Sequence, residues 1–584
     1  MLELIRNKKS VLYAVITVGI EIFFVKVFWG GFSFLTNDDS WIQATLNGTI
    51  TGGRYPYHQF INSYFGMFLC YINRFIPTNR LWFYCLLICS AVGLIMLHYS
   101  ILEKAKNKFL GLFFILMEAC LYEVYCLSSL SFTLSPILLS VGAISLLFID
   151  EPNNNISYKK IIFVSVIVFI ASLIRYQSIL PIILFYAVCL YHYLYNNCVS
   201  DISKNQVNIK LCLLTLFLVT LIYGANVFSE TTQNKLGDGT FGEFNRYRVT
   251  FMDYPHPDYD EAPDLYEKYG WNKSTFELIN AGCFLPEEFS IDSLKGICYN
   301  SEEKSNGSFT DAIGSIINKI SYLRIATREF FRITALTYYN TIKIATLLFF
   351  LLIAVVVIKT IREKELKHFR IFIIMIGICS IIMILYLISG QRTVMRAFLC
   401  IFIPMMNFLL LSYGELMSKK PFNDDDYNSN GWFKNVVTII FFLILVVGIH
   451  SYALASSEQN NLRKANKWEP YYDYIVDHPD SVFVYSDVYA IPINIDLFLP
   501  NNAFFWGGSG VGSDLSKKQL RENGFLKFTI ENLNDDNVYF IGTGYEEHDV
   551  LKILKYLEEK GIIAKCNIID NIGEVGVVYK FSWN

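Results

Sequence analysis

The chain has 584 residues, of which 53% are hydrophobic and only 17% charged, and its formal net charge is −3. A soluble protein of this length would carry a larger share of charged residues on its surface. Apolar stretches of about 17–25 residues recur, which is the length that crosses a bilayer. No basic cluster with interleaved aromatic residues suggests a nucleic-acid partner. The composition therefore predicts a polytopic α-helical membrane protein.

About eleven spanning helices are expected. The first follows a basic flank like that of a signal peptide, but its apolar run is too long and no small-residue cleavage site follows, so it is interpreted as a retained anchor. The segments that flank "LIRYQSILP" are either a broken helix pair or a tight hairpin. The apolar runs lie near residues 11–34, 81–97, 109–125, 132–149, 161–174, 179–194, 211–227, 345–358, 371–388, 397–411 and 436–450.

The loop charges predict the orientation. Lys and Arg concentrate in "RNKK", "EKAKNK", "YKK", "KTIREKELKHFR" and "MSKK". Eleven spans place all of these segments on one side, which the positive-inside rule makes cytoplasmic. The N-terminus is then cytoplasmic in a multi-pass cell-membrane protein. A first loop at 35–78, a large loop at about 229–335 and the C-terminal region lie outside.

Two domains are expected, a membrane domain over 1–454 and an extracytoplasmic domain over 455–584. In the second, "DSVFVYSDV", "DNVYFIGTG" and "GEVGVVYKF" are typical of short strands, and "EEHDVLKILKYLEEKGI" of an amphipathic helix that ends at a glycine. This alternation predicts a small α/β domain. "GGSGVGS" lacks the Lys-Ser/Thr of a P-loop, so we interpret it as a surface loop.

Most of the 13 cysteines fall in apolar runs, where they act as small hydrophobic residues. Cys283 and Cys298 lie together in a polar loop. They form a disulfide if that loop faces an oxidising space, or they are two unrelated free thiols. No cysteine spacing indicates zinc or a redox pair.

Two adjacent carboxylates, Asp38 and Asp39, follow the first apolar run in "FLTNDDSWIQATLNGTITGGRYPYHQF". One interpretation is helix capping, because Asp and Asn suit an N-cap. Two amphipathic pieces then follow, "DSWIQATLNG" and "FINSYFGMFLCYINRFI", which we expect to lie along the membrane surface. An aromatic turn, "GGRYPYHQF", separates them.

This arrangement resembles the GT-C superfamily of membrane glycosyltransferases, which includes protein mannosyltransferases and aminoarabinose transferases. "NDDSWIQATLNGTITGGRYPYHQFINSYFGMFL" is similar to their first external loop, with an acidic pair and two surface helices, and the layout is similar over roughly the first 450 residues. The resemblance implies a GT-C-like fold and transfer of a sugar from a polyprenyl-phosphate donor to an extracytoplasmic glycan, lipid or protein. The tail resembles no family that we know.

The resemblance also implies roles for the pair. Asp38 would be the base that takes the proton of the attacking hydroxyl, in an inverting reaction. Asp39 would orient it, or bind a divalent ion or the acceptor. The sequence requires no cofactor and leaves the need for a metal open.

A lipid-phosphate donor needs cations at the same membrane face, and Arg matches phosphate geometry. Arg175, Arg392 and Arg396 lie at external helix ends in this topology, where they bind the phosphate or extend to lipid headgroups. Arg54 and His58 share the loop of the acidic pair and are either part of the site or merely solvated.

Further candidates are less specific. Arg246 and Arg248 lie in the loop at about 229–335, which either covers the site and helps with phosphate or is a plain structured lid. Glu123 is placed near an external helix end and could line the cavity. Glu21 and Lys26 are expected to be partnered structural charges within the first span.

Three other functions fit parts of the sequence. A transporter or flippase for lipid-linked glycans would show internal repeats and broken helices at the bilayer midplane. A polymerase or ligase of lipid-linked glycans would use the same donors but needs no acidic pair after the first span. A non-catalytic scaffold that presents the tail needs neither the acids nor the arginines.

Overall fold

The computed structural model describes most of the chain, and all statements below concern this part. It covers residues 8–584 except for 51, 106, 150–155, 197–203, 237–238, 254–255, 304–322, 334, 362–365, 390–392, 419–426, 466–467, 487–494, 496–499, 508–510 and 543–546.

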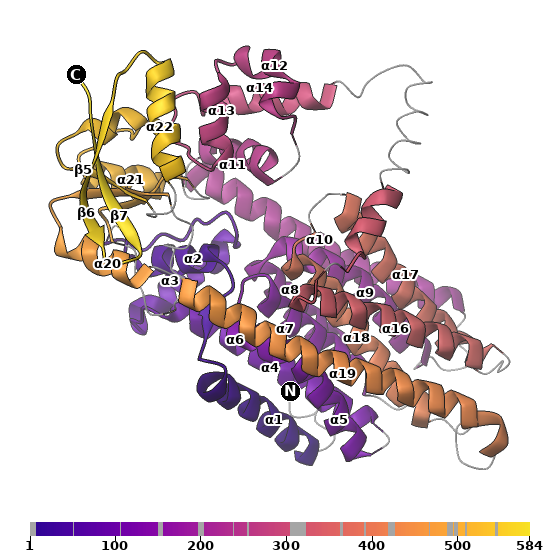
Figure 1. Cartoon of the computed structure of the whole chain (residues 1–584). Coiled ribbons are helices and arrows are strands. Elements are labelled where there is room, and N and C mark those ends of the chain that lie inside the picture. Colours follow the sequence, from indigo (N-terminus) through magenta and orange to yellow (C-terminus); the bar gives the residue numbers. More distant parts are fainter. Residues whose placement is uncertain are drawn as a thin grey trace.

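Nine of the described helices are long and apolar enough to cross a membrane. The protein is therefore a polytopic helical membrane protein, as its composition predicts. The helices form one bundle (Figure 1). They are α1 (Lys8–Phe28), α4 (Leu81–Lys104), the continuous α5 (Lys108–Glu118), η2 (Ala119–Glu123) and α6 (Val124–Ser128), α9 (Tyr176–Asn196), α10 (Lys204–Leu236), α16 (Tyr338–Thr360), α17 (Lys367–Ser389), α18 (Met395–Ser418) and α19 (Tyr427–Ala465).

Two shorter apolar helices complete the bundle, α7 (Leu134–Ser145), which continues as η3 (Leu146–Phe148), and α8 (Tyr158–Ile174). Each of the eleven predicted apolar runs thus forms a helix. Every residue of α7 is buried, and α7 packs against α4, α8, α9 and α18. The close packing of α4 and α7 depends on glycine, because a Cβ on Gly142 would lie 2.0 Å from the carbonyl oxygen of Gly93.

The segment "LIRYQSILP" forms a tight hairpin. Helix α8 ends at Ile174 and α9 begins at Tyr176, with Arg175 alone between them in an extended conformation (φ −153°, ψ 100°). At the other end of the pair, the backbone N–H of Ser157 donates to the Tyr193 hydroxyl at 3.0 Å. The two helices are therefore antiparallel, and the reversal places the Arg175 side chain at their shared end.

The two predicted surface helices are α2 (Asn37–Asn47) and α3 (Ser63–Phe75). They lie between the bundle and the C-terminal sheet (Figure 1). Helix α2 ends at Gly48, whose φ of 79° is in the left-handed region that glycine adopts without strain. Apolar side chains of α2, α3 and the start of α4 share one small core.

The C-terminal region contains the predicted α/β domain. Its five-stranded sheet has the order β4-β3-β5-β7-β6, with β3 parallel to β4 and β5, and β7 antiparallel to β5 and β6. The three strands and one helix expected from the sequence correspond to β3, β5, β7 and α22. The elements are α20 (Trp468–Asp477), β3 (Val482–Tyr485), β4 (Ala503–Phe505), α21 (Asp514–Glu522), η8 (Ile530–Asn534), β5 (Val538–Gly542), α22 (Glu547–Glu559), β6 (Lys565–Ile572) and β7 (Gly576–Ser582).

The predicted large loop is largely helical. Helix α10 continues as far as Leu236 and is followed by several short helices. These are α11 (Gly239–Asp253), η4 (Tyr259–Glu261), α12 (Pro263–Glu267), α13 (Lys273–Asn280) and α14 (Ile291–Glu303). We call residues 239–303 the helical insert; its core is aromatic, built around Tyr266 and Trp271.

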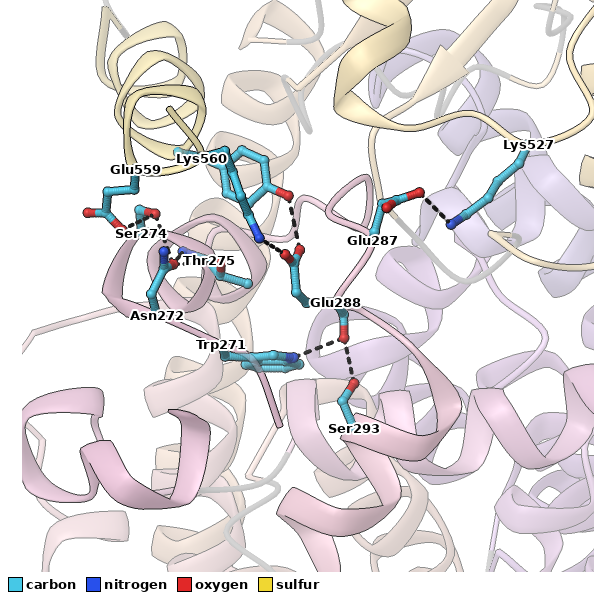
Figure 2. Close-up of polar contacts among 11 residues, drawn as sticks. Trp271, Asn272, Ser274, Thr275, Glu287, Glu288, Ser293, Lys527, Glu559 and Lys560 are labelled. Atoms are coloured by element: carbon cyan, nitrogen blue, oxygen red, sulfur yellow. Dashed lines mark hydrogen bonds and ion pairs between the residues drawn. The ribbon is translucent and has the colours of Figure 1, made fainter. Parts of the chain in front are cut away.

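The helical insert packs against the C-terminal domain. Glu288 is the centre of the contact in Figure 2: its carboxylate accepts hydrogen bonds from Tyr556 (2.9 Å) and Lys560, and its backbone oxygen accepts one from Trp271 Nε1 (2.9 Å). Leu278 and Cys283 of the insert belong to the core of the C-terminal domain. The two regions, far apart in the sequence, therefore form one packed body.

Cys283 and Cys298 are two free thiols. Cys283 lies in the core that the insert shares with the C-terminal domain, and Cys298 lies in the aromatic core of the insert. The possible disulfide between them is therefore not formed.

Candidate functional site

The acidic pair is positioned by two linkers that meet beside the bundle. After α1 the chain forms β1 (Ser33–Phe34), which pairs in parallel with β2 (Ser129–Leu130) in the linker between α6 and α7. The backbone N–H of Leu35 continues this ladder to the Leu130 carbonyl at 2.9 Å. Because α2 starts directly after β1, its first turn lies against the second linker.

Asp39 is fully buried in this first turn and accepts three hydrogen bonds. Trp82 Nε1 and the backbone N–H of Phe132 donate to Oδ1 at 3.1 and 3.0 Å, and the Thr36 hydroxyl donates to Oδ2 at 2.9 Å. Burial raises the pKa of Asp39 to about 7, although the three donors favour its ionised form. Asp39 thus fixes the start of α2 against α4 and the α6–α7 linker.

Asp38 is partly buried beside it, also in the first turn of α2. The positive end of the helix dipole favours a carboxylate there. Asp39 is enclosed by its three donors, whereas the side chain of Asp38 remains partly exposed to solvent. The roles expected from the sequence, with Asp38 as the base and Asp39 as the group that orients it, stay a prediction.

The buried carboxyl predicts a pH effect on stability. An unfolded Asp ionises near pH 3.9, whereas Asp39 in the folded chain holds its proton up to pH about 7. Between these values the unfolded state binds fewer protons, so stability falls as pH rises, by up to about 1.4 kcal/mol per pH unit. We expect the thermal midpoint in detergent to fall between pH 4.5 and 7 and then to become independent of Asp39.

Asp39→Asn is the control for this effect. The amide oxygen can keep the bonds from Trp82 and Phe132, and its N–H₂ can donate to Thr36, whose hydroxyl reverses its role. The variant should fold and lose this part of the pH dependence. Identical slopes for Asp39→Asn and the unchanged protein would show that Asp39 does not titrate in this range.

Phe132 connects the acidic pair to the candidate arginine. Its backbone N–H binds Asp39, and its ring lies under the Arg175 guanidinium, 4.5 Å from Cζ to the ring centroid. The ring of Phe60 lies 5.4 Å from the same guanidinium. Asp39 and Arg175 therefore both contact Phe132, and the expected role of Arg175 in phosphate binding stays a prediction.

His58 is 5% exposed and lies near Arg175. Burial and the positive charge of Arg175 lower the pKa of His58 to about 3, so the imidazole is neutral. Its Nδ1 accepts a hydrogen bond from the backbone N–H of Phe60 at 3.4 Å. Nε2 therefore carries the proton, and no described group accepts it. His58 is thus a neutral, buried side chain and not merely solvated; its role in substrate binding stays a prediction.

Arg396 lies in the first turn of α18. The Cys400 thiol, one turn further, is within electrostatic range of both the Arg396 and the Arg175 guanidinium groups. Two of the three arginines expected at external helix ends thus lie in the same neighbourhood. Arg392 lies outside the described residues.

Four other candidates lie elsewhere. Arg54 is exposed and donates to the Asn73 carbonyl near the end of α3. Arg248 is buried in the helical insert, where it donates to the Asn245 side chain, and Arg246 is exposed on the same helix. Glu123 is fully buried inside the bundle against His98, so the expectation that it lines an external cavity is corrected.

Two clefts adjoin the segment that carries His58 and Phe60. The larger encloses about 670 Å³, part of it open to solvent, between this segment, the α8–α9 hairpin and α10. The smaller has about 270 Å³ of empty space, also partly open to solvent, between α2, the same segment, the helical insert and the C-terminal domain. Gln59 lines both clefts.

The larger cleft is polar and lies next to Arg175. Ser172, Leu173, Tyr176 and Gln177, on either side of Arg175 in the sequence, are among its lining residues. We call it the hairpin cleft. Polar side chains of the opposite wall come from α10; they are Asn226, Ser229, Glu230 and Gln233.

The smaller cleft contains residues that sequence analysis did not single out. Phe241 comes from the insert and Ser513 and Leu515 from the start of α21, and these close the cleft over Trp41 and Tyr55. We call it the roofed cleft. The sequence also did not predict the roles of Trp82 and Phe132, which donate hydrogen bonds to Asp39. A tryptophan in an apolar run and a backbone amide have no distinctive sequence signal.

One group of three metal-ligating side chains occurs in the described residues, and it lies inside the bundle and not at the acidic pair. Comparison of the chain with protein-family models and with curated proteins finds no match.

Proposed function

We propose that the protein is a membrane glycosyltransferase that moves a sugar from a polyprenyl-phosphate donor to an extracytoplasmic acceptor. The observation that carries the proposal is the double role of Phe132, which binds Asp39 through its backbone and Arg175 through its ring. Asp38, the neighbour of Asp39 in the first turn of α2, would then supply the base for the acceptor, and Arg175 the cation for the leaving phosphate. Inverting transfer from a lipid phosphate needs this combination.

The hairpin cleft supports a lipid-linked donor. A phosphate at its polar wall would lie beside Arg175, with Arg396 close by. Helix α10, which forms the opposite wall, exposes a row of apolar side chains that a polyprenyl chain can follow: Leu213, Leu216, Phe217, Tyr223 and Phe228. The donor could thus enter sideways from the bilayer.

The roofed cleft is the proposed acceptor side. It has aromatic side chains suited to stacking on a sugar, Trp41, Tyr55 and Tyr57, and the buried N–H of His58 as a donor. Gln59 separates it from the hairpin cleft. Transfer would take place across this segment, with Asp38 taking the proton.

The proposal includes a GT-C-like arrangement with eleven crossings. The short helices α7 and α8 then span the membrane with the nine longer ones, the N-terminus is cytoplasmic, and α2, α3, the insert and the C-terminal domain are outside.

The experiment is a transfer assay with the full chain in lipid vesicles, polyprenyl-phosphate donors that carry radiolabelled sugars, and cell-envelope acceptors. Label in the acceptor with inverted linkage supports the proposal, and movement of intact donor across the bilayer without transfer contradicts it.

A further inference from the structure

A second buried site lies inside the bundle, away from the clefts. It joins Glu21 of α1, His98 of α4 and Glu123 of η2. His98 Nε2 is 3.1 and 3.2 Å from the two carboxyl oxygens of Glu123 and 3.9 Å from Oε1 of Glu21. His98 and Glu123 are fully buried and Glu21 is 7% exposed. Potential ligand atoms of all three lie within 4.8 Å of one another.

The Thr17 hydroxyl lies between the Ala14 carbonyl, 3.0 Å away, and His98 Nδ1, 2.8 Å away. In the tautomer that satisfies both contacts, the hydroxyl donates its one proton to Ala14 and accepts a proton from Nδ1. In the neutral ring Nε2 then has a lone pair that faces the oxygens of Glu123. Two acceptors that face each other repel, unless a proton or a cation lies between them.

Glu118 adds a further buried carboxyl group to this cluster. It is fully buried, and no hydrogen-bond donor among the described residues reaches either of its oxygens. Its carboxyl group instead faces that of Glu123. The only basic residue among the described ones that pairs with this cluster is His98, through Glu21 and Glu123. Three carboxyl groups without a Lys or Arg partner are expensive inside an apolar bundle.

The backbone aims Glu118 and Glu123 at the same place. Residues five apart on an α-helix point in directions about 140° apart, because each residue turns by about 100°. Here the segment Ala119–Glu123 is a π-helix, in which the N–H of Val124 bonds to the carbonyl of Ala119. The wider turn brings the two acids to one side. Such π-bulges occur frequently at functional sites.

We propose that Glu21, His98 and Glu123, with Glu118 as a fourth donor, bind a divalent transition-metal ion of the zinc and manganese class. One imidazole nitrogen with two or three carboxylate oxygens is a usual ligand set for such ions. Thr17 orients the imidazole as second-sphere hydrogen bonds do in metal sites. The ion holds α1, α4 and the α5–η2–α6 helix together, independently of the reaction at the acidic pair.

The test is the metal content of the full chain, purified in detergent and measured by mass spectrometry of the elements. We expect about one zinc or manganese ion per chain. Dialysis against EDTA should lower the thermal midpoint, and added Zn²⁺ or Mn²⁺ should restore it. A metal-free chain whose midpoint responds to neither ion would overturn the proposal, and this measurement needs no variant to fold.

Two variants then locate the ion. His98→Gln or Glu123→Gln should lower the metal content at least about tenfold. His192→Gln is the matched control, because His192 is a second buried histidine paired with a single acid, Glu415 at 2.9 Å. It should keep the ion. Full metal content in folded Glu123→Gln, or its loss in folded His192→Gln alone, would contradict the assignment.

Discussion

Asp38→Asn is expected to lower the rate of sugar transfer by about 10²–10⁴-fold, the range that a positioned base contributes. The amide keeps the size of the side chain but cannot take the proton of the attacking hydroxyl. Binding of the lipid donor should change little, so the loss should appear in kcat and not in KM for the donor. Initial rates over a range of donor concentrations measure both quantities.

Asp292→Asn is the matched control for this variant, since Asp292 is an exposed acid in the first turn of another helix, α14. It should transfer sugar at the unchanged rate. A fully active Asp38→Asn protein would remove the proposed base. Loss of activity that accompanies a lowered thermal midpoint would instead indicate that Asp38 is only a helix-capping residue.

Arg175→Met is expected to reduce kcat/KM for the lipid donor on the order of 100-fold, within the range for removing one partner of a buried charged contact. Methionine keeps much of the volume between the rings of Phe60 and Phe132 but has no charge. Arg175→Lys keeps the charge without the planar fork and should restore the activity only in part. The measurement is the dependence of transfer on donor concentration.

Arg248→Met is the matched control for the loss of a buried arginine outside the proposed site. Arg248 is also buried and lies over an aromatic ring, 5.9 Å from the centroid of Phe284, but in the helical insert. Its removal should leave donor use unchanged. Equal activity of Arg175→Met and Arg175→Lys would mean that the protein does not use the charge of Arg175, and the proposed phosphate site would be lost.

Much of the fold follows from local patterns in the sequence. Apolar runs of membrane length predict the bundle helices, since a spanning helix has to satisfy its own backbone in lipid. Strands β3, β5 and β7 carry the β-branched and aromatic residues typical of buried strands. Strand β6, with its largely exposed "KCNIIDNI", has no such alternation and was not predicted.

The candidate site was predictable only in part. Charged residues at the ends of apolar runs stand out, so Asp38, Asp39 and Arg175 could be identified. Their contact through Phe132 depends on tertiary packing of the α6–α7 linker, for which no local pattern exists. The same holds for His98, which meets Glu21 and Glu123 from a different helix.

The C-terminal domain also reaches the first loop, which the sequence did not indicate. Leu515 of α21 shares a small core with Ala44 and Ile50, and the Gln43 side chain donates to the Ile495 carbonyl at 3.0 Å. These contacts join α2 to the C-terminal domain. The domain therefore helps to position the helix that carries the acidic pair.

The central claim places the acidic pair outside the cell, and labelling with a membrane-impermeant maleimide tests it most directly. Asn37→Cys puts a thiol on an exposed position next to Asp38, and Lys367→Cys puts one on the exposed start of α17, on the opposite face in the proposed topology. With unchanged protein as the baseline, Asn37→Cys should react in intact cells and Lys367→Cys only after permeabilisation. The reverse pattern would contradict an extracytoplasmic site for sugar transfer.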